Sequence, residues 1–447
     1  QKRALPTIDW LADLAHRANR RLMVRLVKGA YWDAEIKMAQ ERGLSDYPVF
    51  TRKASTDVSY LACAKRLFAD PAAFYPAFAT HNAHTLAAIA EIAASTGCDD
   101  WEYQRLHGMG EELYDEVVGK NKWGRACRIY APVGSHEELL AYLVRRLLEN
   151  GANSSFVNRI ADADLPIETL LTDPVDRVAK LAAKPHPGIP LPRDLFGAER
   201  ANSEGLDMYD KPTLDSLRRA IELSTTVSYV AAPVIGGQPV NGESRPVCSP
   251  ADKRDIVGQV IDASNEHVGK AMSAAHAAFS AWEGTGAAER ATILERAATM
   301  LQRRLTELVA LIVREGGRTQ ADAVSEAREA IDFCRYYAGQ AREKFAEPIL
   351  LPGPTGERNT LSLHGRGVFV CISPWNFPLA IFVGQIAAAL AAGNTVVAKP
   401  AEQTPLIAAL AVQVLHQAGV PADALALLPG DGRIGAALVA DRRCAGV

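Results

Sequence analysis

Short apolar runs alternate with longer amphipathic segments along the first part of the chain. Buried strands are predicted at residues 21–27, 47–51, 74–79, 101–106 and 127–130. Helices are predicted at residues 7–20, 33–43, 57–69, 83–96 and 136–150. This alternation with short connections predicts an α/β barrel or an open parallel sheet. Because a closed barrel needs eight strands, we expect residues 1–160 to form the C-terminal half of a (β/α)8 barrel whose first half lies upstream of Gln1.

The pattern changes in the middle of the chain. Residues 184–205 contain four prolines and lack apolar periodicity, which predicts an extended linker within a linker region at 161–225. A second domain is expected at 226–447. It begins with a strand at 229–235 that ends in a hairpin at Gly236-Gly237. Further helices are predicted at 213–224, 265–282, 287–315 and 320–345, and residues 348–364 are predicted to be irregular or strand-like.

Residues 365–403, GRGVFVCISPWNFPLAIFVGQIAAALAAGNTVVAKPAEQ, have the pattern of a crossover unit. Three predicted elements follow one another: a strand at 368–372, a helix at 379–392 and a strand at 395–398. A strand, a long helix and a second strand form a βαβ unit of a parallel, Rossmann-like sheet. Ligands of such sheets bind beyond the carboxyl ends of the strands, and Asn376, Lys399 and Glu402 fall there.

Composition excludes several classes of protein. The net charge is −3 and basic residues form no run, so no nucleic-acid partner is expected. The most apolar segment, 379–392, is shorter than the roughly 20 residues that span a bilayer, so we expect no integral membrane segment. Seven cysteines without a C-x-x-C pair favour a reducing cytoplasm and no metal site. Both ends of the chain look cut, since it starts without Met and ends in a strand-like segment.

One helix combines groups that could bind a zwitterion. In YLVRRLLENG, Tyr142, Arg145 and Glu149 share one face, and Arg146 is adjacent. Two guanidinium groups could hold a substrate carboxylate while the glutamate holds an ammonium group. The alternative is a solvated helix with an ordinary ion pair between residues four apart.

Polar groups also follow several predicted strands. They are Arg25, Lys28-Gly29-Ala30, Arg52-Lys53 and Thr80-His81-Asn82. Together they could surround a phosphorylated cofactor, because glycine allows close approach of the backbone and cations attract phosphate. Taken singly, each group is also typical of an ordinary loop, and a lone histidine is commonly structural.

Six segments of the first 200 residues resemble the proline dehydrogenase part of the bifunctional proline utilization A flavoenzymes. They are RLVKGAYWDAEIK, YPVFTRKASTDVSYLACAKRLF, FATHNAHTL, RLHGMGEELYDEV, CRIYAPVGSHEELLAYLVRRLLENGANSSFVNRI and KPHPGIPLPRDLFG. This resemblance implies a distorted (β/α)8 barrel that holds FAD and transfers a hydride from proline C5 to flavin N5.

The same resemblance implies roles for individual residues. For the proline site it implies Arg145, Arg146, Glu149, Tyr130 and Tyr142. For FAD it implies Arg25 near the flavin ring and Val27, Lys28, Gly29, Ala30, Tyr31, Trp32, Arg52, Lys53, Thr80, His81 and Asn82. The family's earlier barrel strands supply further groups, which would precede Gln1, so the half-barrel alone is expected not to bind FAD tightly.

Residues 226–447 resemble the aldehyde dehydrogenase superfamily, specifically the glutamate-semialdehyde dehydrogenase half of the same bifunctional enzymes. The motifs are SPWNFP and GNTVVAKPAEQTP. The resemblance implies that Asn376 donates to an oxyanion and that Lys399 and Glu402 bind the adenosine ribose of NAD. A carboxylate there would repel a 2'-phosphate, which favours NAD over NADP. Ile372, Pro374 and Trp375 complete the implied NAD site.

Two further patterns are weaker. Gly430 to Gly435 matches G-x-G-x-x-G, but the chain ends before the acidic residue expected about 20 positions later. Cys371 lies five residues before Asn376, yet its apolar surroundings predict a buried structural thiol. The family's nucleophilic cysteine and general-base glutamate are expected beyond Val447.

These observations predict oxidation of proline to pyrroline-5-carboxylate with FAD, followed by NAD-dependent oxidation of glutamate semialdehyde to glutamate. We expect this chain alone to be an inactive part of such an enzyme. The resemblance further implies a cytoplasmic homo-oligomer with peripheral membrane contact through quinone reduction. The alternative is a non-catalytic NAD-binding or scaffold protein of aldehyde dehydrogenase fold.

Overall fold

The computed structural model describes residues 2–29, 31–151 and 172–447. The chain divides into two compact units, which are treated separately below. The first contains residues 1–39 and 46–190, and the second contains residues 40–45 and 191–447. The short segment 40–45 thus belongs with the second unit, where the Gly205 N–H donates to the Gly43 carbonyl oxygen at 2.8 Å.

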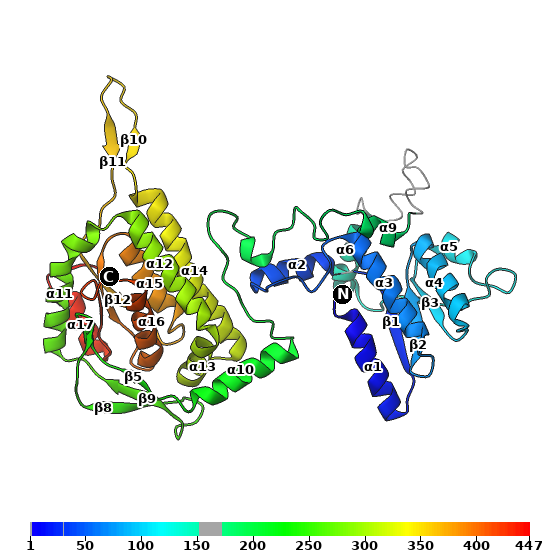
Figure 1. Cartoon of the computed structure of the whole chain (residues 1–447), viewed down its shortest axis with the longest axis horizontal. Helices are drawn as coiled ribbons and strands as arrows, with labels where there is room; N and C mark the ends of the chain where they lie inside the picture. Colours follow the sequence, from blue (N-terminus) through cyan, green and yellow to red (C-terminus); the bar gives the residue numbers. More distant parts are fainter. Residues whose placement is uncertain (1, 30, 152–171) are drawn as a thin grey trace. The chain divides into compact units, whose positions relative to one another are not determined.

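The first unit is built on a parallel sheet of order β1-β2-β3-β4 (Figure 1). Its strands are β1 (Leu22–Leu26), β2 (Phe74–Ala79), β3 (Glu102–Leu106) and β4 (Cys127–Tyr130). The helices of this part of the chain are α1 (Ala4–Ala18), α2 (Trp32–Glu41), α3 (Lys53–Phe68), α4 (Ala83–Thr96), α5 (Glu111–Asp115), α6 (His136–Gly151) and α9 (Pro174–Ala179). The predicted alternation of strand and helix in a parallel sheet is confirmed.

Alternation along the strands separates the two faces of this sheet. Phe78 and Tyr103 point into the core under α3 and α4, where Phe68 and Trp101 join them. Ring centroids in this group lie 4.7 to 5.8 Å apart, mostly edge to face, which is the favoured geometry for aromatic rings. Residues one position along the strands, such as Glu102, therefore point to the opposite face.

The strand predicted at 47–51 is wrong, because this segment forms no strand. Its alternating burial is real, since Tyr47 and Val49 are both buried. However, its partners are loop segments: the Tyr47 hydroxyl donates to the Pro190 carbonyl oxygen at 2.5 Å, and the His186 N–H donates to Thr51 Oγ1 at 2.9 Å. Pro48 also lacks the N–H that a ladder would need. Part of the predicted linker thus covers this segment.

The second unit contains a six-stranded sheet of order β15-β12-β13-β14-β6-β7. Its strands are β6 (Val234–Ile235), β7 (Gln238–Pro239), β12 (Val368–Ile372), β13 (Thr395–Lys399), β14 (Leu425–Leu427) and β15 (Cys444–Gly446). Strands β12 to β15 pair in parallel, and α15 (Ala380–Ala391), α16 (Pro405–Ala418) and α17 (Gly432–Ala440) connect them. The predicted βαβ unit is therefore confirmed.

A smaller sheet of order β5-β9-β8 lies in the same unit. Its strands are β5 (Tyr229–Ala231), β8 (Ser244–Cys248) and β9 (Ile256–Ile261). The single strand predicted at 229–235 is thus two strands in different sheets, β5 and β6. Pro233 lies between them and has no N–H for a ladder, which accounts for the interruption. The predicted hairpin at Gly236-Gly237 does join β6 to β7.

Helices cover both sheets of the second unit. They are α10 (Lys211–Ser224), α11 (Asn265–Glu283), α12 (Ala287–Arg303), α13 (Leu305–Gly316) and α14 (Gln320–Phe345). The long helix predicted at 287–315 is broken at Arg304, which has φ −100° and ψ 13° and ends α12. Apolar positions continue through the break, so periodicity did not reveal it. The linker contains a short 3-10 helix, η1 (Pro192–Asp194).

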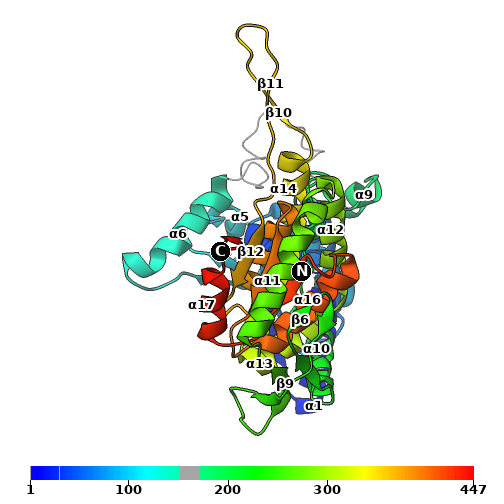
Figure 2. The same cartoon turned by 90° about the vertical axis from the view of Figure 1, so that its left-hand side faces the viewer.

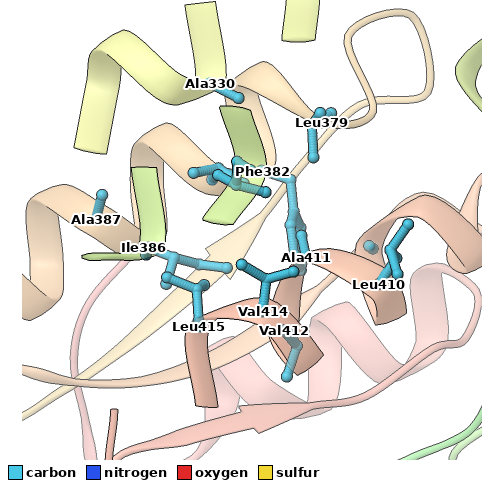
Figure 3. Packing of buried hydrophobic residues seen from close by; sticks show 14 of the residues in the cluster. Ala330, Leu379, Phe382, Ile386, Ala387, Leu410, Ala411, Val412, Val414 and Leu415 are labelled. Carbon is cyan, nitrogen blue, oxygen red and sulfur yellow. The ribbon is translucent and has the colours of Figure 1, made fainter. Parts of the chain in front are cut away.

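Helix α15 packs against α14 on one side and against β12 and β13 on the other, in a core that also includes residues of α16. Figure 3 shows Phe382 and Ile386 of α15 beside Ala411 and Leu415 of α16, with Ala330 of α14 above them. The apolar character of α15 on nearly every side follows from this position between layers.

A hairpin of β10 (Ile349–Leu351) and β11 (Asn359–Leu361) projects from the body of the second unit in both views (Figures 1 and 2). This agrees with the irregular or strand-like prediction for 348–364. Among the described residues, no helix has the length and apolar character needed to cross a membrane.

Candidate functional site

The carboxyl edge of the first sheet brings several predicted residues together. Parallel pairing aligns Leu26 with Phe78, so the segments after β1 and β2 begin side by side. A pocket at this edge contains three of the residues predicted to bind a phosphorylated cofactor. It is lined by Lys28, Lys53, Asp57, Leu61, Asn82, His84, Thr85, Thr172, Pro174 and Arg177.

Two lysines in this pocket share one carboxylate. Lys28 Nζ lies 2.8 Å from Asp57 Oδ1, and Lys53 Nζ lies 2.8 Å from Asp57 Oδ2. Lys28 also donates to Thr85 Oγ1 at 2.8 Å. Burial lowers the pKa of Lys28 although Asp57 opposes the effect. Burial by itself raises the pKa of Asp57, but the two lysines outweigh it and the net shift is downward. Two lysine ammonium groups thus face one carboxylate among the described residues.

The Thr80-His81-Asn82 segment is fixed by local hydrogen bonds. Asn82 is the N-cap of α4 and accepts from the Thr85 N–H at 2.9 Å, while Thr80 Oγ1 accepts from the Asn82 N–H at 3.1 Å. His81 Nε2 accepts from the Leu106 N–H at 3.2 Å. Burial, and then nearby arginines, lower the pKa of His81 to about 4. Its imidazole is therefore neutral, with the proton on Nδ1.

Arg25 and Tyr130 meet on the face of the sheet that also carries Glu102, opposite the aromatic core. The Arg25 guanidinium donates to the Tyr130 hydroxyl and lies 4.4 Å from the centroid of its ring. On α6, the Arg146 guanidinium lies 5.1 Å from the ring centroid of Tyr142. The side chains of Arg145 and Glu149, and the whole of Ala30, lie outside the described residues.

Other predicted cofactor residues are held in different ways. Trp32 Nε1 donates to the Phe50 carbonyl oxygen at 2.7 Å, and Arg52 Nε donates to the Pro185 carbonyl oxygen at 3.1 Å. Gly29 has φ 42°, a left-handed conformation that suits a residue without a Cβ atom. Val27 and Tyr31 are exposed, at 50% and 57%.

In the second unit, Lys399 lies at the carboxyl end of β13, opposite Ile372 at the end of β12. Only 4% of Lys399 is exposed, and its Nζ donates to the Pro400 carbonyl oxygen at 2.8 Å. Burial lowers the pKa of this lysine, while Glu402, Asp431 and Asp262 oppose the shift. Gly435 of α17 lies next to the Lys399 side chain, since a Cβ atom built on this glycine would stand 3.4 Å from Lys399 Cδ.

The remaining predicted residues of this edge are accessible. Asn376 is exposed, as are Pro374 and Trp375. Glu402 is exposed too, and its main-chain oxygen lies 3.4 Å from Nη2 of Arg245. Arg245 is held by Asp262 through contacts of 2.7 and 3.1 Å. The accessible Asn376 amide and Glu402 carboxylate thus lie on loops that follow neighbouring strands, and the buried Lys399 ammonium group lies at the end of β13. A dinucleotide would bind at this edge in a sheet of this type.

The two weaker sequence patterns, Cys371 and the glycine pattern from Gly430 to Gly435, both lie in the second unit. Cys371 is buried, and burial raises its pKa to about 12, so the thiolate that nucleophilic attack requires is disfavoured. Asp431, within the glycine pattern, is the N-cap of α17 and accepts from the Arg433 N–H at 2.9 Å. No cluster of three potential metal ligands occurs in the described part of the chain.

Sequence reasoning missed Asp57, Thr85 and Asp262. Asp57 lies four residues after Lys53, a spacing that indicates an ion pair on one helix face. Nothing local indicated that the same carboxylate would also meet Lys28, which is 29 positions away.

Comparison with known proteins gives a separate family match in each half of the chain. The proline dehydrogenase family model matches residues 1–159, and the aldehyde dehydrogenase family model matches residues 238–447. The bifunctional protein PutA of Klebsiella aerogenes is 55% identical over 458 aligned residues, which cover 100% of this chain and 34% of that protein. PutA of Escherichia coli K12 is 54% identical, with the same coverage.

Solved structures give the same result. The crystal structure of an Asp-to-Trp mutant of Bradyrhizobium japonicum proline utilization A matches with a TM-score of 0.84 at 52% identity, over 100% of this chain and 42% of that one. A 1-pyrroline-5-carboxylate dehydrogenase from Thermus with bound NAD matches 56% of this chain and 49% of its own, with a TM-score of 0.52 at 33% identity. The chain spans about a third of the length of its PutA relatives. The chain thus contains a segment that matches the proline dehydrogenase family followed by a segment that matches the aldehyde dehydrogenase family, and over its whole length it is similar to part of the bifunctional PutA proteins.

Proposed function

We propose that the protein to which this chain belongs oxidises proline to glutamate in two steps. The first unit of this chain contributes to FAD-dependent oxidation of proline to pyrroline-5-carboxylate. The second unit of this chain contributes to NAD-dependent oxidation of glutamate semialdehyde. One observation supports the proposal: in each unit several predicted cofactor residues, including Lys28 and Asn82 in the first and Lys399 in the second, lie at the carboxyl edge of a parallel sheet, the position used for ligands in such folds.

The first edge fits a flavin dinucleotide. Lys28 and Lys53 face one carboxylate among the described residues, and two ammonium groups suit a pyrophosphate. Neutral His81 can donate through Nδ1 because its Nε2 is occupied by the Leu106 N–H. Arg145, Arg146 and Glu149 would hold the carboxylate and ammonium groups of proline, a role that rests on the family motif.

The second edge fits a nicotinamide dinucleotide. Glu402 is exposed and could accept hydrogen bonds from ribose hydroxyls, while buried Lys399 supplies a cation nearby. The exposed Asn376 amide would donate to the oxyanion that forms at the aldehyde carbon. Bound at these two edges, FAD would supply the hydride acceptor for proline oxidation and NAD would supply the hydride acceptor for aldehyde oxidation. A homo-oligomeric state, a cytoplasmic location and peripheral membrane contact are also proposed for the whole protein.

The test uses the whole protein to which this chain belongs, the parent protein. It compares the Asn376→Ala variant with the unchanged parent protein in the reduction of NAD by glutamate semialdehyde. Loss of an oxyanion donor is expected to lower kcat by about 100- to 1,000-fold while NAD affinity stays unchanged. Asn241→Ala, which changes an exposed asparagine in a loop of the same unit, is the matched control. Proline oxidation with a dye acceptor, measured in parallel, tests the first step. NAD binding without turnover by the parent protein would instead support a non-catalytic NAD-binding role.

A further inference from the structure

Two glutamates of the helical layer are almost fully buried in the second unit, and the proposed reaction does not use them. Glu315, in the last turn of α13, is 3% exposed, and Glu326, near the start of α14, is 1% exposed. Buried carboxylates are rare unless they are paired or accept hydrogen bonds. Both accept from backbone N–H groups at the beginning of another helix.

Glu326 holds the loop that follows β12. Its Oε1 accepts from the Leu379 N–H at 2.8 Å and lies 3.4 Å from the Ala380 nitrogen, at the start of α15. Its other oxygen lies 3.6 Å from Nε of Arg318. The Arg318 guanidinium in turn lies 4.6 Å from the ring centroid of Phe377, the residue after Asn376. The end of the SPWNFP loop is thus tied to the helical layer through two contacts.

Glu315 holds the loop that follows β13. Its Oε1 accepts from the Leu406 N–H at 2.6 Å and its Oε2 from the Ile407 N–H at 2.9 Å, in the first turn of α16. That helix has no side-chain cap of its own, and the N-cap residue Thr404 leaves Oγ1 buried without a hydrogen-bond partner. The loop between Lys399 and α16 therefore has one end in a strand and the other on Glu315.

Electrostatics supports this arrangement. The first N–H groups of a helix lack partners, and the positive end of the helix dipole attracts an anion. Burial raises the pKa of Glu315 to about 8, while its two N–H donors act in the opposite direction. Burial also raises the pKa of Glu326, opposed by its own backbone donors and Arg318. Local Ser or Asp caps would satisfy the same N–H groups without burying a carboxylate, but they would not link each loop to α13 or α14.

We propose that Glu326 and Glu315 are positioning residues for the aldehyde-oxidising site: Glu326 sets the position of Asn376, and Glu315 sets that of the Lys399–Glu402 loop. The inference rests on the proposed function, because it assigns oxyanion stabilisation to the first loop and NAD binding to the second. Each glutamate should then affect a different kinetic constant.

The experiment uses Glu326→Gln and Glu315→Gln, in which an amide NH2 replaces one accepting oxygen. Glu326→Gln is expected to lower kcat for semialdehyde oxidation about tenfold with little change in KM for NAD. Glu315→Gln is expected to raise KM and Kd for NAD about tenfold with little change in kcat; either effect corresponds to loss of about one hydrogen bond. Glu343→Gln on α14 and Glu307→Gln on α13 are matched controls. If a Gln variant does not fold, the corresponding Asp variant, Glu326→Asp or Glu315→Asp, is measured in its place, because it keeps the carboxyl group.

Hydrogen exchange separates this inference from the proposed function. The N–H groups of Leu379 and Leu406 should exchange about tenfold faster in the corresponding Gln variant, whether or not the protein turns over substrate. A parent protein without NAD-dependent activity would refute the proposed function but leave this measurement valid. Equal losses of kcat and NAD affinity in both variants, or exchange rates unchanged from the parent, would overturn the positioning roles.

Discussion

His81 shows how position in the fold sets the chemistry of a single residue. The sequence places it after a strand, among groups that suit a phosphorylated cofactor. Its ring nitrogen Nε2 is occupied by the Leu106 N–H, and burial lowers its pKa to about 4 from the ordinary 6.5. The imidazole is thus a neutral donor at physiological pH rather than a cation that could pair with phosphate.

This shift predicts a pH dependence of stability. Between pH 6.5 and pH 4 the unfolded chain binds a proton at His81 that the folded chain does not, so the free energy of unfolding should fall as the pH decreases through that window. Urea denaturation of the first unit at both pH values measures the loss. His81→Gln should reduce the difference, because glutamine does not titrate. His107→Gln, at an exposed histidine, should leave it unchanged. An equal pH dependence in both variants would contradict the prediction.

At the scale of elements, α15, the segment 47–51 and the strands β5 and β6 illustrate what periodicity can and cannot predict. The apolar character of 379–392 correctly predicted a buried helix between layers. The segment 47–51 was predicted to be a strand, but it is covered by loop residues instead of a neighbouring strand. The apolar run at 229–235 predicted one strand, but Pro233 interrupts it. The two parts, β5 and β6, belong to different sheets.

Packing of α15 against α14 and the central strands should contribute strongly to the stability of the second unit. Phe382 of α15 is fully buried in this core (Figure 3). Phe382→Ala should lower the free energy of unfolding by about 3–5 kcal/mol, because it removes a large side chain from a core that can relax only partly. Val439→Ala on α17, at a side chain that is 47% exposed, should change it by less than about 0.5 kcal/mol. Chemical denaturation followed by circular dichroism measures both values, and equal effects would contradict the packing described here.

At the scale of the whole molecule, the chain carries two separate candidate sites on two compact units. Lys28→Ala should weaken FAD binding without leaving Asp57 unpaired, because Asp57 keeps Lys53 as a partner. NAD binding should be unchanged, because the predicted NAD residues belong to the other unit. Lys399→Ala should do the reverse. Titration with each cofactor gives the affinities, with an expected loss of about tenfold or more per removed charged contact. Lys344→Ala, at an exposed lysine near the end of α14, is the control. Loss of both affinities in either variant would argue against independent sites.

The sequence by itself determined the local features of this protein. Apolar spacing predicted most helices and strands, and the order of strand and helix predicted parallel sheets with polar residues at their carboxyl ends, because these depend on neighbours in the chain. Only the tertiary structure decided which distant groups meet. Asp57 balances Lys28 across 29 positions, and Glu315 holds the start of α16 across more than 90. Such contacts depend on how elements pack, and no spacing along the chain encodes them.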